Sequence, residues 1–176
     1  MAYIFETEHL KIRKFTSEDA HALYRNHLEE KVRKWIPNES YGSLEEAESA
    51  AVFYADRATK GVLPCVLAVE RKENGELIGD VGINEVAGNP EEVEIGYTIS
   101  ERYSGKGYAT ELLRSMTNFV CSTWKCRVLY GRVMRGNVAS VRVLEKNGYV
   151  FEREESGSED DPWGYGILVY KKVAES

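Results

Sequence analysis

The fold is decided by one stretch of the chain, Arg102-Tyr103-Ser104-Gly105-Lys106-Gly107-Tyr108-Ala109. Its two glycines stand between a strand-like segment and a segment with helical periodicity. Because glycine has no Cβ, a ligand can approach the backbone of such a loop closely. The free N–H groups at the start of the following helix and the positive end of its dipole favour an anion there. With the added charge of Arg102 and Lys106, the stretch predicts a pyrophosphate site; the alternative is that the glycines only form a turn.

Two other phosphate-binding patterns do not fit this stretch. The P-loop pattern, G-x-x-x-x-G-K-[ST], has no frame here because Lys106 is followed by Gly107. The dinucleotide fingerprint needs a third glycine where Thr110 stands. It also needs an acidic residue about 20 positions further on, and residues 124–131 contain none. The loop therefore belongs to neither class.

The segments before the loop have the pattern of consecutive antiparallel strands. Residues 64–70 and 76–86 flank Asn74-Gly75, a dipeptide typical of tight hairpins. A turn at 88–90 then leads into a strictly alternating strand over 93–99. Short turns join strands that are neighbours and antiparallel, so three such strands precede the glycine loop.

The remaining chain adds helices and further strands. Helical periodicity predicts helices over residues 16–28, 43–59, 106–122 and 137–148. Alternation predicts further strands over residues 10–15, 127–134, 149–152 and 163–170. This order predicts an α/β (α+β) fold, a single domain with a mixed, mostly antiparallel sheet of about six to seven strands and about four flanking helices.

Composition limits the class of protein. The chain has 176 residues, 43% of them hydrophobic, which is the size and composition of one globular domain. Its formal net charge of −6 gives no support to nucleic-acid binding through a basic face. An acidic protein suits a cationic substrate such as an amine, although the charge also serves solubility alone.

Cysteine, histidine and hydropathy patterns predict neither a metal site nor a membrane span. The three cysteines match no zinc or redox spacing, and the three histidines are scattered. His27 is interpreted as a packed residue, because nothing acidic is spaced to orient it. No apolar run approaches ~18 residues and no signal-peptide pattern is present, so we expect a cytoplasmic protein with reduced thiols.

The glycine loop resembles a known family. Arg102-x-x-Gly105-x-Gly107 is similar to the acetyl-CoA pyrophosphate loop, [QR]-x-x-G-x-[GA], of the GNAT superfamily of N-acetyltransferases. Residues 137–149 resemble its N-x-x-S-x-x-x-x-E-K-x-G-[FY] segment. Residues 6–13 and 94–97 resemble the RimJ/RimL branch, which acetylates protein N-termini. The motifs follow in order over essentially the whole chain, so residues 1–176 are identified as one GNAT-like domain.

The resemblance implies how acetyl-CoA binds, with no metal. The sheet is expected to be splayed between the strands at 93–99 and 127–134 to admit the pantetheine arm. Main-chain bonds to that arm are implied for Tyr97, Thr98 and Ile99. The pyrophosphate contacts are implied for Arg102, Ser104, Gly105, Lys106, Gly107, Tyr108 and Ala109. Asn137 is expected to contact the arm, to cap its helix, or both. Arg142 and Lys146 share one helix face and either meet the 3′-phosphate or are solvated surface charges.

The resemblance, together with the chemistry of amine acetylation, implies two catalytic residues. The amine must lose its proton, and an α-amino group has a pKa of ~8. The family uses a carboxylate as the base, and Glu94 is the candidate here. Glu85 and Asp80 are the substitutes. Alternatively, Glu94 is only a polar residue on a solvated face of the sheet. Leu144 stands where many members place a tyrosine that protonates the CoA thiolate. In the RimJ/RimL branch, a serine at the position of Ser140 lies near the sulfur, so Ser140 is the candidate for this role. Alternatively, Ser140 is a small residue that permits close packing.

The sequence leaves the acceptor open. The leading hypothesis is a protein N-terminal α-amine; the alternatives are a small amine (polyamine, amino acid or aminoglycoside) or a non-catalytic module that binds acyl-CoA. We expect acceptor contacts from the first two helices, the turn at 35–38 and the acidic loop before Trp163. A monomer or a homodimer is expected, with no nucleic-acid or membrane partner.

Overall fold

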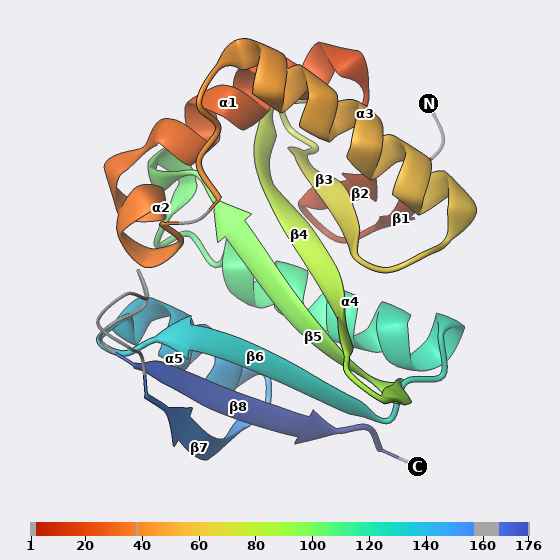
Figure 1. The fold of residues 1–176 in the computed structure, drawn as a ribbon, viewed down its shortest axis with the longest axis vertical. Helices are drawn as coiled ribbons and strands as arrows, with labels where there is room; N and C mark the ends of the chain where they lie inside the picture. The colour runs from red at the N-terminus through yellow and green to blue at the C-terminus, as the bar shows by residue number, and fades with distance from the viewer. Residues whose placement is uncertain (1–2, 38, 157–165, 176) are drawn as a thin grey trace. The chain divides into compact units, whose positions relative to one another are not determined.

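The computed structural model describes residues 3–37, 39–156 and 166–175. These residues form eight strands and five α-helices (Figure 1). The chain divides into two compact units, each made of two separate segments. Unit 1 comprises Met1–Ile83 and Tyr97–Ala109, and unit 2 comprises Asn84–Gly96 and Thr110–Ser176.

Unit 1 contains the N-terminal strands and the first three helices. Its elements are β1 (Tyr3–Glu6), β2 (Leu10–Arg13), α1 (Ala20–Leu28), α2 (Glu30–Trp35), α3 (Leu44–Lys60), β3 (Cys65–Arg71) and the 3-10 helices η1 (Ser17–Asp19) and η2 (Glu101–Tyr103). In Figure 1, α1 and α3 lie beside each other, and α3 packs on β3. The core between them is formed by Phe15, Leu23, Ala51, Ala68 and Leu77.

Two strands and one helix have residues in both units: β4 (Leu77–Val86), β5 (Asn89–Ile99) and α4 (Tyr108–Thr123). The hairpin between β3 and β4 forms as its Asn74-Gly75 turn predicts. Gly75 has φ +70°, a backbone conformation that favours glycine. Its N–H donates to the Arg71 carbonyl at 2.8 Å, and the Asn74 Oδ1 accepts from the Glu76 N–H at 3.1 Å. The turn residues therefore set the register of the antiparallel pair, which runs from Cys65↔Ile83 to Glu70↔Leu77.

Unit 2 contains β6 (Val128–Met134), α5 (Val138–Lys146), β7 (Val150–Glu155) and β8 (Ile167–Val173). The strand order of the whole sheet is β1-β2-β3-β4-β5-β6-β8-β7. β5 and β6 are parallel, while β6, β8 and β7 pair antiparallel. The sheet is therefore mixed, as predicted.

Pairing between β5 and β6 is short. It covers Glu92–Glu94 with Val128–Tyr130. β5 continues to Ile99 and β6 to Met134, and β6 remains paired with β8 as far as Met134. The short register agrees with the predicted separation of the strands at 93–99 and 127–134.

The predicted counts of six to seven strands and four helices were too low. The four-residue β1, which pairs with β2 through an irregular register, is too short to show a clear alternation. The predicted helix over 16–28 is a 3-10 turn followed by α1, and α2 is a separate helix after Glu29. Glu29 has φ −59° and ψ 139°, an extended conformation that ends one helix before the next begins. Asn38 and Trp163, which belong to the expected turn at 35–38 and strand over 163–170, lie outside the described residues.

The other element predictions hold to within a few residues. Ser43 caps α3 by accepting a hydrogen bond from the Glu46 N–H at 3.2 Å. In a capping box, the Glu46 side chain would accept a hydrogen bond from the Ser43 N–H. Here its carboxylate accepts instead from the N–H of Gly42, one residue earlier, at 2.7 Å. α5 ends at Lys146, and Gly148 follows with φ +79°, as a helix-stopping glycine does.

Candidate active site

The glycine loop has the backbone geometry that its sequence predicts. Gly105 has φ +73° and Gly107 has φ +84°, conformations that strain any residue with a Cβ. Apart from each glycine and its two chain neighbours, no atom of the described residues lies within 4 Å of the point where a Cβ would stand on either glycine. α4 begins at once after Gly107, with Tyr108 and Ala109 as its first two residues. The backbone beside both glycines is therefore open to a ligand at the start of a helix.

Glu76 holds the N-terminal part of the loop in place. Its carboxylate forms an ion pair with the Arg102 guanidinium at 2.5 Å and accepts a hydrogen bond from the Tyr103 hydroxyl. The Arg25 guanidinium lies 3.5 Å away. The Tyr103 hydrogen bond and the Arg102 charge lower the pKa of Glu76. Arg102 is thus already paired within the protein.

The other loop residues are arranged around Tyr103 and the turn that precedes the glycines. The Lys106 ammonium lies 5.5 Å from the Tyr103 ring centroid. Ser104 Oγ donates to the Glu101 carbonyl at 2.8 Å, which closes the turn of η2. Lys106 has no ion-pair partner among the residues that the structure describes, so its charge is available to a ligand.

Arg71 is a part of this site that sequence reasoning missed. Its Nε donates to the Tyr108 hydroxyl at 2.9 Å, and its guanidinium carbon lies 5.2 Å from the Tyr103 ring centroid. The residue stands at the end of β3, far from the loop in sequence, and has no local pattern that would have found it. Arg71 brings a third cation, with Arg102 and Lys106, to the Tyr103 ring.

The backbone of Tyr97–Ile99 has alternating orientations. The Thr98 carbonyl oxygen points at Gly79 of β4, where a Cβ would lie 2.0 Å from it. Ser100 N–H, two residues on, donates to the Ile78 carbonyl of the same strand at 2.7 Å. Since main-chain groups alternate along a strand, those of Tyr97 and Ile99 point away from β4. Tyr97 and Ile99 therefore have the orientation needed for main-chain bonds to a ligand, and Thr98 does not.

Glu94 occupies a desolvated position on the sheet of unit 2. It pairs with Tyr130 in the parallel register of β5 and β6. Burial raises the pKa of its carboxyl group; the Arg132 charge opposes this rise and Glu155 adds to it. Arg132 is itself in an ion pair with Glu155 at 3.1 Å. A carboxylate with a raised pKa is a stronger proton acceptor, which suits a general base.

Asn137 and Ser140 form the start of α5. The Asn137 Oδ1 accepts from the Ser140 N–H at 3.3 Å, so the predicted cap is confirmed. One turn later, Leu144 is buried against Gly131, where a Cβ would meet its Cδ2 at 2.4 Å. Leu144 at the usual tyrosine position is thus a packing residue over β6.

Glu94 and Ser140 are not brought to the same face of the sheet. Leu144 places α5 over the face on which Gly131 lies. Successive residues of a strand face opposite sides, so Tyr130 and its partner Glu94 face the other way. Ser140 belongs to the helix side, and Glu94 to the opposite side.

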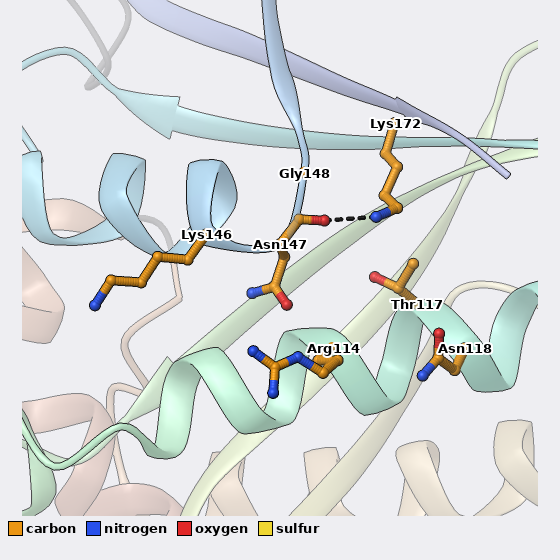
Figure 2. Close-up of a pocket in the computed structure, with 7 residues that line it drawn as sticks. All are labelled: Arg114, Thr117, Asn118, Lys146, Asn147, Gly148 and Lys172. Carbon is orange, nitrogen blue, oxygen red and sulfur yellow. Dashed lines mark hydrogen bonds between the residues drawn. The ribbon is translucent and has the colours of Figure 1, made fainter. Parts of the chain in front are cut away.

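A cleft of about 290 Å³ lies between α4 and the end of α5 (Figure 2). It is lined by Arg114, Thr117, Asn118, Lys146, Asn147, Gly148 and Lys172. The Lys172 ammonium donates to the Asn147 carbonyl at 2.6 Å. Cations at a helix C-terminus complement its dipole, which gives Lys146 and Lys172 a structural role here. Arg142 is exposed and does not line this cleft.

The substitute bases differ from Glu94. Asp80 Oδ2 lies 2.6 Å from His27 Nε2, and both residues are buried. The expectation that nothing acidic orients His27 was therefore wrong, because its partner comes from a strand much later in the chain. Glu85 is exposed. Of the three carboxylates, Asp80 is engaged in a buried pair and Glu85 is solvated, which leaves Glu94 as the half-buried carboxylate outside such a pair.

Two further observations concern the described part of the chain only. Its side chains include no group of three or more histidine, cysteine or acidic residues placed to hold a metal ion. Within the same residues, no helix has the length and apolar character needed to cross a bilayer.

The strand order and the glycine loop before α4 define a GNAT-like α/β fold. A family model described as "Acetyltransferase (GNAT) domain" matches residues 9–150. Since the match covers most of the chain, the chain belongs to the GNAT acetyltransferase family, and it is an N-acetyltransferase. Structural neighbours that share this fold include a RimL and a RimJ protein.

Relatives in sequence and structure agree with this assignment. The uncharacterized N-acetyltransferase YoaA of Bacillus subtilis is 28% identical over 151 residues, which cover 83% of this chain and 82% of that protein. A RimL ribosomal L7/L12 α-N-protein acetyltransferase in complex with coenzyme A superposes with a TM-score of 0.84 at 18% identity, covering 98% of each chain. The ribosomal-protein-S5-alanine acetyltransferase of Vibrio fischeri superposes with a TM-score of 0.82 at 19% identity, covering 96% of this chain and 95% of that one.

Proposed function

We propose that residues 1–176 act as one domain that transfers the acetyl group of acetyl-CoA to a primary amine, specifically a protein N-terminal α-amine. The amine attacks directly, with both substrates bound together. The observation that carries the proposal is the open backbone of Gly105 and Gly107 at the start of α4.

The loop fits the diphosphate of CoA for three reasons. Both glycines expose their backbone, and the first N–H groups of α4 lack partners within the helix. Lys106, which forms no ion pair with any described residue, supplies a positive charge, while Arg102 and Ser104 support the turn from within the protein. The RimL neighbour was solved with coenzyme A, and an acetyltransferase neighbour, MccE, with acetyl-CoA and AMP. Tyr97 and Ile99 would bind the pantetheine arm through their main chains, and Asn137 would contact it from α5.

Acetyl-CoA, when bound, supplies an acetyl group activated as a thioester. Glu94 accepts the proton that the amine nitrogen loses as it forms the new C–N bond. Its raised pKa brings its basicity closer to that of the amine and so favours this transfer. Ser140 stabilises the departing sulfur by donating a hydrogen bond from its hydroxyl, since Leu144 has no proton to give. Ser140 would reach the sulfur from the α5 side of the sheet, while Glu94 meets the amine from the opposite side. Lys146 and Arg142 are assigned to the 3′-phosphate.

Two observations favour different acceptors. Structural neighbours described as ribosomal-protein acetyltransferases support a protein N-terminus. A spermine/spermidine N(1)-acetyltransferase of Bacillus subtilis, 28% identical over 58 residues, supports a small polyamine. An α-amine has a lower pKa than an alkylamine, so it needs less help from a single carboxylate base. We therefore favour the α-amine.

Thiol release from acetyl-CoA separates these functions. The panel contains short peptides with free N-termini, the same peptides with acetylated N-termini, spermidine and an aminoglycoside. We expect release with free N-termini and none with the blocked peptides. Release with spermidine or the aminoglycoside alone would overturn the α-amine assignment. Binding of acetyl-CoA without release by any acceptor would instead indicate a non-catalytic module.

A further inference from the structure

The junction between α1 and α2 is linked to the segment that leads into the glycine loop. Glu29 is the single residue between the two helices. Its Oε1 accepts from the Ser100 hydroxyl at 2.6 Å, and its Oε2 accepts from the Glu101 N–H at 2.5 Å. The carboxylate therefore caps the start of η2, the 3-10 turn before the glycines.

A second carboxylate, that of Glu101, caps the start of α2 in the same way. Glu101 Oε1 accepts from the Lys31 N–H at 2.5 Å. Lys31 lies in the first turn of α2, where backbone N–H groups have no acceptor within the helix. Glu29 thus caps the loop-side turn, and Glu101 caps α2. We call Glu29, Lys31, Ser100 and Glu101 the cross-cap.

The cross-cap is anchored at a rigid point. Ser100 is 0% exposed, and its N–H donates to the Ile78 carbonyl of β4 at 2.7 Å. Glu101 in turn belongs to the loop-side turn, because its carbonyl accepts from both the N–H and the hydroxyl of Ser104. Gly105 follows directly. A ligand that fixes the glycine loop therefore also restricts Glu101.

α2 depends on contacts of this kind. It has six residues, a length at which a helix has little stability of its own. Val32 is its buried side chain, and the Glu101 carboxylate is the side-chain acceptor for its first-turn amide. Its order should therefore follow the position of Glu101.

We propose that Glu29 and Glu101 are positioning residues that couple α2 to the cofactor-binding loop, so that CoA bound at the loop stabilises α2. This inference rests on the proposed function, because it takes CoA as the ligand of the loop. The segment after α2 is where the sequence predicts acceptor contacts.

Hydrogen exchange with CoA as the probe tests this coupling without any acceptor. In the native protein, saturating CoA slows exchange in peptides covering residues 101–107 and also in those covering residues 30–36. A typical coupling between sites predicts about fivefold or greater slowing in the second segment. A purely structural contact would leave exchange over 30–36 the same with and without CoA.

Variants of Glu101 identify the contact responsible. Glu101→Ala removes the acceptor for Lys31 N–H, so CoA should still protect 101–107 but no longer 30–36. Glu101→Gln keeps a side-chain oxygen that can accept from the Lys31 N–H, so this variant should retain the coupling. Glu30→Ala is the matched control: it removes a neighbouring exposed carboxylate of α2 outside the cross-cap and should retain the coupling too. Thermal midpoints confirm that each variant is folded.

Calorimetry supplies a second readout. Because coupling is reciprocal, Glu101→Ala should weaken CoA binding by the same factor, about fivefold, while Glu101→Gln binds as the native protein does. Protection of 101–107 without protection of 30–36 in the native protein would overturn the coupling and leave the proposed function intact. Absence of any CoA-dependent protection over 101–107 would overturn the proposed function itself.

Discussion

Asp80 on β4 and Glu94 on β5 are both partly or wholly removed from solvent, yet their surroundings give them opposite roles. Asp80 is bonded to the buried His27 at 2.6 Å. No described residue donates a hydrogen bond to the Glu94 carboxylate, and burial raises its pKa. A carboxylate bonded to a buried imidazole contributes to stability, whereas a partly buried carboxylate without a hydrogen-bond donor can accept a proton. In the proposed mechanism, Asp80 therefore serves stability and Glu94 serves proton transfer.

The largest effect is expected from Glu94→Gln. The substitution keeps the size of the side chain and removes the basic oxygen. A general base contributes ~10²–10⁴-fold to rate, so turnover at neutral pH should fall at least tenfold. Acetyl-CoA affinity should be unchanged, because the base meets the acceptor amine. Steady-state thiol release and calorimetry on the same preparation measure both quantities.

The pH dependence of that variant distinguishes a base from a positioning charge. Raising the pH should recover part of the lost turnover, since more of the amine is then already deprotonated. In the native enzyme, turnover should decline as the pH falls through the raised pKa of Glu94. A loss in Glu94→Gln that is the same at every pH, or full activity at pH 7, would contradict the base assignment.

Asp80→Asn should act on stability instead. Removing one partner of a buried ion pair costs about 3 kcal/mol of unfolding free energy, and His27 is left without its counter-charge. Turnover per folded molecule should remain near the native value. Denaturant unfolding measures the first quantity and active-site-normalised kinetics the second. If Asp80→Asn loses turnover as Glu94→Gln does while remaining equally stable, the two roles are reversed.

A smaller, pH-dependent effect is expected from His27. Burial lowers the pKa of its imidazole, but the charge and hydrogen bond of Asp80 outweigh this and leave the pKa raised above 6.5. A group with a raised folded-state pKa contributes stability below its unfolded pKa and loses it as the pH rises through the folded value. The thermal midpoint should therefore fall as the pH is increased above 6.5. This slope should be absent in Asp80→Asn; an equal slope in both proteins would assign it to other groups.

Patterns that are local in sequence predicted much of the fold. The Asn74-Gly75 hairpin, the caps at Ser43 and Asn137, and the glycine loop are each specified within a few residues. In each case the hydrogen bond or backbone angle that matters lies between close neighbours in the chain. The sequence therefore predicted the order of the elements and the position of the glycine loop before α4.

Contacts between distant segments could not be predicted in this way. Asp80 reaches His27 across 53 positions, and Arg71 reaches Tyr108 across 37. The cap of α2 by Glu101 likewise joins segments that no periodicity connects. Such pairs form because the fold brings two elements together, so a single sequence carries no local sign of them. The burial that raises the pKa of Glu94 has the same origin.

The most direct test of the account is acetyl-CoA binding by the native protein and by Gly107→Glu, measured by calorimetry. Gly107 has φ +84°, and its backbone faces open space in which the diphosphate is placed. A glutamate there adds backbone strain, a side chain in that space and a charge of the same sign as the phosphates. The account predicts that affinity falls more than tenfold, a loss above ~1.4 kcal/mol. Equal affinity in the two proteins would show that acetyl-CoA does not bind at this loop.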